Sequence, residues 1–205
     1  VAIEFATPGW DVITAGSWAG RWDFSVGSMA ITTPRERVIA FSEPYYFTPA
    51  QMAASTASGI TTLEGLAGKT ICVGAATTYF DWMMGTLDLG VYTPEAVPPE
   101  GSEVTTLETD RLCAEAWQAG RRDFEGWLSS TTTVELAIEE GLPLVKVGDP
   151  VYHEPLAVAF DRAGPDPTTI IERVNTILDE MRADGTLRTL SEKWFGRDLT
   201  VGPGA

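Results

Sequence analysis

The sequence predicts an α/β protein with mostly parallel sheets, and three observations carry this prediction. Strand-like runs alternate with helix-like patterns, as where "KTICVG" at 69–74 is followed by a helical pattern from Asp110. The C-terminal third contains two amphipathic helix patterns, and the first of them opens at Asp166-Pro167. No internal repeat interrupts the alternation. Such alternation favours parallel strands connected by helices.

Three elements are expected before residue 40. A short helix is predicted over 11–19, ending at Gly20, and a strand over 22–28, where apolar and polar residues alternate. The residues "TPRE" at 33–36 fit a capping box, with Thr33 at the N-cap and proline at the first helical position.

The middle of the chain predicts a strand at 69–74 and a helix capped by Asp110 and closed by Gly120. Further strands are expected at 123–128, 143–147 and 156–160. In the C-terminal third, one helix runs from Asp166 to Gly185 and a second ends before Gly196.

The composition excludes several classes of function. A formal net charge of -15 argues against binding to nucleic acids or anionic membranes, which need basic surfaces. No apolar run approaches the roughly 18 residues of a membrane span. A single histidine, His153, and no CxxC pair argue against a metal site, and the absence of GxSxG argues against a catalytic triad. We therefore expect neither a metal nor a cofactor.

Five motifs carry a family resemblance, because they occur in order and at family-like spacing. They are "GRWDFSVGSMAITTPR", "FSEPYY", "LAGKTICVGAATT", "AGRRDF" and "DGTLRTLSEKWFG". The chain resembles the type II periplasmic substrate-binding proteins of the polar amino-acid ABC uptake family (family 3 extracellular solute-binding proteins). The resemblance implies a two-lobed fold with two hinge crossings. Lobe I is then 1–53 plus 152–205, and lobe II is 54–151.

The resemblance also implies a function. A protein of this kind is an extracytoplasmic receptor, here expected to be a monomer, that closes around an amino acid or a related small carboxylate. It delivers this ligand to the membrane subunits of an ABC importer and performs no catalysis. Two alternatives stay open: a cleft enzyme of the same fold, such as a prephenate- or arogenate-type dehydratase, and a ligand-sensing domain.

In lobe I the resemblance makes Arg35 the anchor of the ligand's carboxylate. Guanidinium offers a planar fork of two donors, and the adjacent helix start adds N–H groups and a positive dipole end. The alternative is a solvated first-turn residue, although the helix dipole disfavours a cation there. The other lobe I residues implied are Trp10, which is equally compatible with a core role, Ser28, Met29, Ala30 and Thr32.

In lobe II the implied ligand-binding residues are Thr77, Thr78 and Ser129. Relatives hold the ligand's ammonium with an acid at the position that falls here on Leu128 or Ser129, and neither side chain carries a charge. Either another acid replaces it, with Glu125 and Asp81 as the nearest candidates, or the ligand lacks an amine.

Two further expectations follow from the resemblance. Cys72 and Cys113 match a cysteine pair of some relatives and are expected to form a disulfide worth roughly 3 to 4 kcal/mol, the alternative being two buried thiols. The sequence also begins where the second strand of the family is expected, so the first strand and helix of lobe I are expected to be absent from it.

Overall fold

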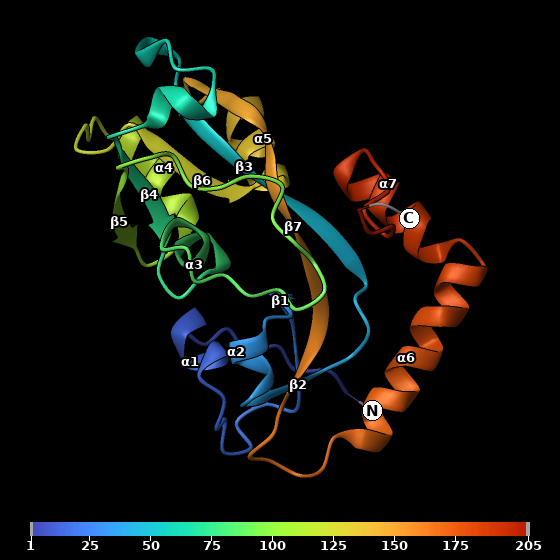
Figure 1. Ribbon diagram of the computed structural model, residues 1–205. Helices are drawn as coiled ribbons and strands as arrows, with labels where there is room; N and C mark the ends of the chain where they lie inside the picture. Colours follow the sequence, from blue (N-terminus) through green and yellow to red (C-terminus); the bar gives the residue numbers. More distant parts are fainter. Residues whose placement is uncertain (1, 204–205) are drawn as a thin grey trace. The chain divides into compact units, whose positions relative to one another are not determined.

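The computed structural model describes residues 2–203 and divides them into two compact units (Figure 1). Unit 1 contains the chain up to Phe47, the short segment Asp88–Gly90 and the chain from Pro155 onward. Unit 2 contains Thr48–Leu87 and Val91–Glu154. The chain therefore passes between the units after residues 47, 87, 90 and 154. The lobes 1–53 plus 152–205 and 54–151 stay a prediction.

Seven strands form within the described residues. They are β1 (Ser25–Ala30), β2 (Ile39–Phe41), β3 (Tyr46–Ser55), β4 (Thr70–Gly74), β5 (Glu103–Leu107), β6 (Gly126–Ser130) and β7 (Leu144–Asp161). In unit 1, β1 and β2 both pair antiparallel with the last third of β7. In unit 2, β4 lies between β5 and β6 and is parallel to both, and β3 pairs antiparallel with β6.

The predicted α/β class is confirmed, but the pairing is mixed rather than mostly parallel. The antiparallel pairs involve β3 and β7, the long strands in which the chain passes from one unit to the other. The two strands predicted at 143–147 and 156–160 are one continuous strand, β7. Polar residues separate the two apolar runs, and for this reason the sequence pattern predicted two strands instead of one.

Seven α-helices accompany the strands in residues 2–203. They are α1 (Trp10–Thr14), α2 (Thr33–Glu36), α3 (Thr78–Met83), α4 (Asp110–Gln118), α5 (Thr131–Glu139), α6 (Thr168–Ala183) and α7 (Thr186–Phe195). The two C-terminal helices and the strand expected at 69–74 are confirmed. The helix expected over 11–19 is shorter, because the backbone turns to positive φ at Gly16 and Ser17.

Two predicted helix caps are each wrong by one residue. The N-cap of α2 is Thr32, not Thr33, and its Oγ1 accepts a hydrogen bond from the N–H of Arg35 at 3.3 Å. The N-cap of α4 is Thr109, not Asp110, and its Oγ1 accepts from Leu112 N–H. In each case a threonine precedes a residue that also caps well, so the sequence pattern alone did not decide which of the two is the N-cap.

The predicted strand at 22–28 lies three residues later, as β1, and its register with β7 shifts between Ser25 and Met29. Ser28 adopts φ 57° at this bulge. Residues Met29 and Ala30 are the buried part of β1, whereas Val26 is 59% exposed. The strand therefore does not show the expected alternation: three exposed residues are followed by the buried pair Met29 and Ala30.

Each unit has its own core. In unit 2, the predicted disulfide Cys72–Cys113 is confirmed, with Cα atoms 5.8 Å apart, and joins β4 to α4. Around it pack Trp127 and the stacked rings of Trp117 and Phe124. Unit 1 is built around a cluster of Trp18, Met29, Ile39 and Ala159. Its helix α6 adds Ile171 and Val174 to a second cluster over β2 and β7.

Candidate functional site

In unit 1, three of the other predicted ligand-binding residues contact Arg35. Its guanidinium donates from Nη1 to the carbonyl oxygen of Ala30 at 3.0 Å and lies over the ring of Trp10, with Cζ 5.5 Å from the ring centre. Thr32 caps the same helix. Arg35 is only 8% exposed, so packing and hydrogen bonding fix the position of its guanidinium.

The main-chain N–H groups at the start of α2 are not available to a ligand, contrary to the prediction. The N–H of Thr33 donates to the carbonyl oxygen of Asp88 at 3.0 Å, and that of Arg35 donates to Thr32. Pro34 has no N–H. Because Thr32 Oγ1 acts as the acceptor in its bond, its own proton can be donated to a ligand. The donors that α2 offers to a carboxylate are therefore side chains, those of Arg35 and Thr32.

Ser28 and Met29 make different contributions. Met29 is fully buried in the core of unit 1, so its side chain belongs to the fold and only its backbone can serve a site. Ser28 sits at the bulge in a left-handed conformation that costs a non-glycine residue free energy. Burial raises the pKa of Tyr45, and hydrogen bonds from Ser28 partly oppose this rise.

In unit 2, Thr77 and Thr78 begin α3. Thr77 is the N-cap: its Oγ1 accepts from Phe80 N–H at 3.3 Å and donates to the carbonyl oxygen of Gly74 at 2.7 Å. Thr78 is 2% exposed and donates its hydroxyl proton to Glu154. The hydroxyl protons of both threonines are thus used inside the unit, which the sequence did not predict.

Ser129 lies at the end of β6 and is fully buried. Its hydroxyl donates to Oδ2 of Asp110, the first residue of α4. Burial raises the pKa of the Asp110 carboxyl, and the hydrogen bond from Ser129 lowers it by a smaller amount. Leu128, the alternative match for the acid that the resemblance implies, is a fully buried core residue.

Asp110 and Glu154 are the functional candidates that sequence reasoning missed. Glu154 is 6% exposed and accepts hydrogen bonds from Thr78 and from the phenol of Tyr79, the latter at 2.9 Å. Burial raises the pKa of Tyr79 well above its usual value, and the nearby charges of Glu154 and Asp110 raise it further. The two acids, Thr78, Tyr79 and Ser129 therefore form one cluster, called here the acidic cluster.

The acidic cluster lies at the carboxyl ends of the parallel strands. At Gly74, the last residue of β4, neighbouring residues pack against the main chain. A Cβ added at this position would lie 2.7 Å from the main-chain nitrogen of Asp110 and 3.0 Å from Cγ2 of Thr77. Crevices at the carboxyl ends of strands are the usual ligand sites of open α/β sheets. Glu125 lies at the opposite edge, where its Oε2 accepts from the N–H of Thr70, the first residue of β4. Glu125 therefore lies away from the acidic cluster.

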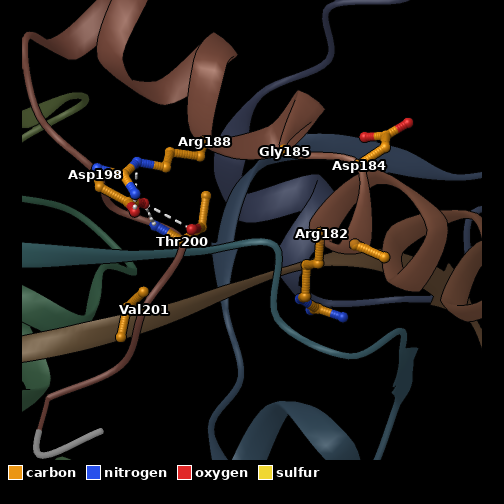
Figure 2. A pocket seen from close by; sticks show the side chains of 8 residues that line it. Arg182, Asp184, Gly185, Arg188, Asp198, Thr200 and Val201 are labelled. Carbon is orange, nitrogen blue, oxygen red and sulfur yellow. Dashed lines mark hydrogen bonds and ion pairs between the residues drawn. The ribbon is translucent and has the colours of Figure 1, made fainter.

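A separate hollow of about 510 Å³ lies on unit 1 at the junction of α6 and α7 (Figure 2). Three of its charged groups are already in ion pairs: Arg188 contacts Glu192 and Asp198, and Arg182 contacts Asp179. None of the predicted ligand-binding residues lines it. We do not assign the ligand to this hollow.

Within residues 2–203, no helix combines the length and apolarity needed to cross a bilayer. The same residues contain no group of three or more potential metal ligands.

The comparison with protein families decides the identity. Residues 1–197 match the family model described as bacterial extracellular solute-binding proteins, family 3. The chain belongs to this family. The match covers both units, so the family assignment holds for the acidic cluster as well as for the surroundings of Arg35.

Two curated members of the solute-binding family illustrate the relationship. The probable amino-acid-binding protein YxeM of Bacillus subtilis is 28% identical over 184 residues, which cover 89% of this chain and 65% of YxeM. The L-cystine-binding protein TcyJ of Escherichia coli is 27% identical over 193 residues, covering 93% of this chain and 66% of TcyJ. The chain thus spans just under two thirds of the length of these relatives.

Solved structures agree on the fold. An ancestral arginine-binding protein bound to arginine superposes with a TM-score of 0.77 at 22% identity, covering 95% of this chain and 81% of that one. This likeness shows that the solute-binding family member described here has the type II periplasmic-binding-protein fold.

Proposed function

We propose that this protein is an extracytoplasmic receptor that binds an amino acid or a related small carboxylate and delivers it to an ABC importer. The observation that carries the proposal is the fixed position of the Arg35 guanidinium. It donates to the carbonyl oxygen of Ala30, lies over the ring of Trp10 and belongs to a helix capped by Thr32. Such a group binds a carboxylate through two parallel charged hydrogen bonds. The amino-acid-binding and cystine-binding relatives support the same ligand class.

In this proposal units 1 and 2 are the two lobes of the receptor, and the protein acts as a monomer. Arg35 and Thr32 supply the donors for the carboxylate, while Trp10 gives the guanidinium an apolar face. No catalytic step is part of the proposal. The partner is the membrane part of the importer, and the place of action is outside the cytoplasmic membrane, as the name of the family suggests.

A thermal-shift screen of the purified protein tests the proposal. The probes are the twenty proteinogenic amino acids, L-cystine, small dicarboxylates and amine-free acids. A ligand that binds only the folded state raises the melting temperature by mass action. We expect at least one carboxylate to raise it, and Arg35→Ala to remove the shift. A panel without any shift, or an unchanged shift in Arg35→Ala, contradicts the proposal.

A cleft enzyme of the same fold is the second candidate function, and one observation favours it. A dehydratase needs a general acid, and the structure contains Asp110, which accepts a hydrogen bond from Ser129 and whose carboxyl has a raised pKa and so holds a proton more readily. Incubation with prephenate and arogenate, followed by substrate loss, separates the two functions. We expect binding without turnover; turnover that Asp110→Asn abolishes supports the enzyme instead.

A further inference from the structure

The buried carboxylate of Asp161, the last residue of β7, holds the turn that follows α1. It accepts hydrogen bonds from the main-chain N–H groups of Ser17 at 2.9 Å, Trp18 at 2.6 Å and Ala163 at 3.0 Å, and both of its oxygens take part. Ser17 adopts φ 56°, a conformation that costs a residue other than glycine free energy. The bonds from Asp161 offset this cost and fix the turn against the end of β7.

The support given by Asp161 reaches the aromatic ring beside the anchor residue. The indole N–H of Trp18 donates to the carbonyl oxygen of Ile13 in α1 at 2.9 Å. Trp10 and Ile13, both in α1, pack against the core cluster that contains Trp18. The ring of Trp10 in turn lies under the guanidinium of Arg35. The chain of contacts from Asp161 therefore ends at the apolar face of the anchor.

The next residue, Arg162, supports α2, the helix that carries the anchor. Its Nε–H is shared between the carbonyl oxygens of Glu36 at 2.8 Å and Ile39 at 3.0 Å. Its main-chain N–H donates to the carbonyl oxygen of Val38 at 3.1 Å. The last carbonyl groups of a helix lack partners within it, and Glu36 ends α2 directly after Arg35. Arg162 therefore fixes the end of α2 that adjoins the anchor.

We propose that Asp161 and Arg162 are positioning residues of the carboxylate anchor. Asp161 orients the ring of Trp10, and Arg162 orients α2. Both act on a bound carboxylate only through Arg35, and all of these contacts lie within unit 1. This inference rests on the proposed function and deepens it, because it names two residues outside the anchor that set its affinity for a carboxylate.

The opposite charges of the two residues separate positioning from simple electrostatic attraction. Asp161→Asn removes a negative charge near a cationic anchor, so charge alone predicts tighter binding of a carboxylate. Positioning predicts weaker binding, because an amide has one acceptor oxygen where the carboxylate has two. The direction of the change in affinity therefore distinguishes the two explanations.

For Arg162, a matched pair of neutral variants isolates the hydrogen bonds. Arg162→Gln places an N–H donor at the position of Nε, whereas Arg162→Met fills similar space without a donor. Both variants remove the same charge, and both should fold because Arg162 is exposed. Arg37→Gln removes a charge from the C-cap of α2 and serves as the control for charge alone.

Calorimetric titrations use the compound of the panel above that raises the melting temperature of the wild type most. Arg162→Met should bind it about 2- to 10-fold more weakly than Arg162→Gln, the range that corresponds to one hydrogen bond. Arg162→Gln should bind it like Arg37→Gln, and Asp161→Asn should bind it more weakly than the wild type. Equal affinities of the two Arg162 variants overturn the role of Arg162. Equal or tighter binding by Asp161→Asn overturns the role of Asp161.

NMR spectra of the isotope-labelled protein without ligand supply a second readout, which a purely structural role would not change. The Trp10 ring shifts the side-chain N–H signals of Arg35, which Arg35→Lys identifies by their loss. Arg162→Met and Asp161→Asn should move these signals toward those of a free arginine, and Arg162→Gln should leave them in place. If affinity falls while the signals stay in place, the positioning inference is wrong.

The two readouts also separate this inference from the proposed function. If the Arg35 signals move as expected but no panel compound binds the wild type, the function fails and the positioning of the guanidinium stands. If compounds bind and the signals never move, the function stands and the inference fails. Should Asp161→Asn not fold, Asp161 serves the fold alone, and the two Arg162 variants decide the inference for α2.

Discussion

The guanidinium of Arg35 donates a hydrogen bond to the carbonyl oxygen of Ala30, five residues earlier in the chain, at 3.0 Å. This bond ties α2 back to the end of β1 and fixes the plane of the guanidinium, which also lies over Trp10. A fixed plane lowers the entropy lost when a carboxylate binds, because the fork is already oriented.

Arg35→Lys should reduce the affinity for any carboxylate ligand at least 10-fold, since an ammonium group cannot supply both the bond to Ala30 and a two-donor fork. Titration calorimetry measures the change. The matched control is Arg37→Lys, because Arg37 is exposed at the end of the same helix. If Arg35→Lys binds as tightly as the parent, the anchor does not depend on the fork.

Thr32→Ala should lower the free energy of unfolding by about 1 kcal/mol, the usual cost of losing an N-cap. The side chain of Thr32 accepts from the N–H of Arg35, and this donor is otherwise left without its bond. Urea unfolding measures the effect. Thr32→Ser keeps the cap oxygen and should stay near the wild-type value, so an equal loss in both variants speaks against capping.

Replacing both cysteines, Cys72→Ala with Cys113→Ala, should lower the stability by roughly 3 to 4 kcal/mol, because the bridge closes a long loop in the unfolded chain. The two residues are 41 positions apart. Denaturation with and without a reductant checks this. The reductant should lower the stability of the wild type and leave the double variant unchanged.

Gly74→Ala should cost roughly 1 to 3 kcal/mol, the usual effect of overpacking. The added methyl group meets the main-chain nitrogen of Asp110 at 2.7 Å, and main chain cannot swing aside as a side chain does. Gly27→Ala is the control, since its added Cβ has one contact, at 3.4 Å to the Ser25 hydroxyl. A loss in Gly74→Ala no larger than in Gly27→Ala contradicts the close approach.

Asp110→Asn should change stability in a pH-dependent way. Burial raises the pKa of Asp110, so the folded protein holds this proton more tightly than the unfolded chain. The stabilising contribution of Asp110 is complete below its unfolded pKa, near pH 4, and is lost as the pH rises through the folded pKa. The variant should therefore gain stability relative to wild type between pH 4 and pH 7.

Urea unfolding of both proteins at the two pH values measures this difference. Glu154 and Tyr79, the other titratable groups of the acidic cluster, are present in both proteins, so their own titration largely cancels. A gain that is equal at pH 4 and pH 7, or larger at pH 4, contradicts a raised pKa for Asp110.

Local patterns predicted those elements whose signals were close together in the sequence. The strand ending at Gly74 and the C-terminal helices α6 and α7 were recognised from apolar spacing and from glycines at their ends. The caps at Thr32 and Thr109 were displaced by one residue, because neighbouring residues cap equally well in isolation. Which of them caps is decided by the backbone that precedes the helix.

The sequence by itself determined the α/β class, because this class depends on how strand and helix patterns alternate along the chain. The resemblance of its motifs to a known family supplied the cysteine pair and the candidate anchor Arg35. Tertiary structure alone decided which acid stands beside Ser129. Asp110 is 19 residues away in the chain, and only the parallel pairing of β4 with β5 and β6 brings the start of α4 to the end of β6. It also decided the direction of the hydroxyl protons, since a hydroxyl turns its proton to whichever acceptor the fold places nearest.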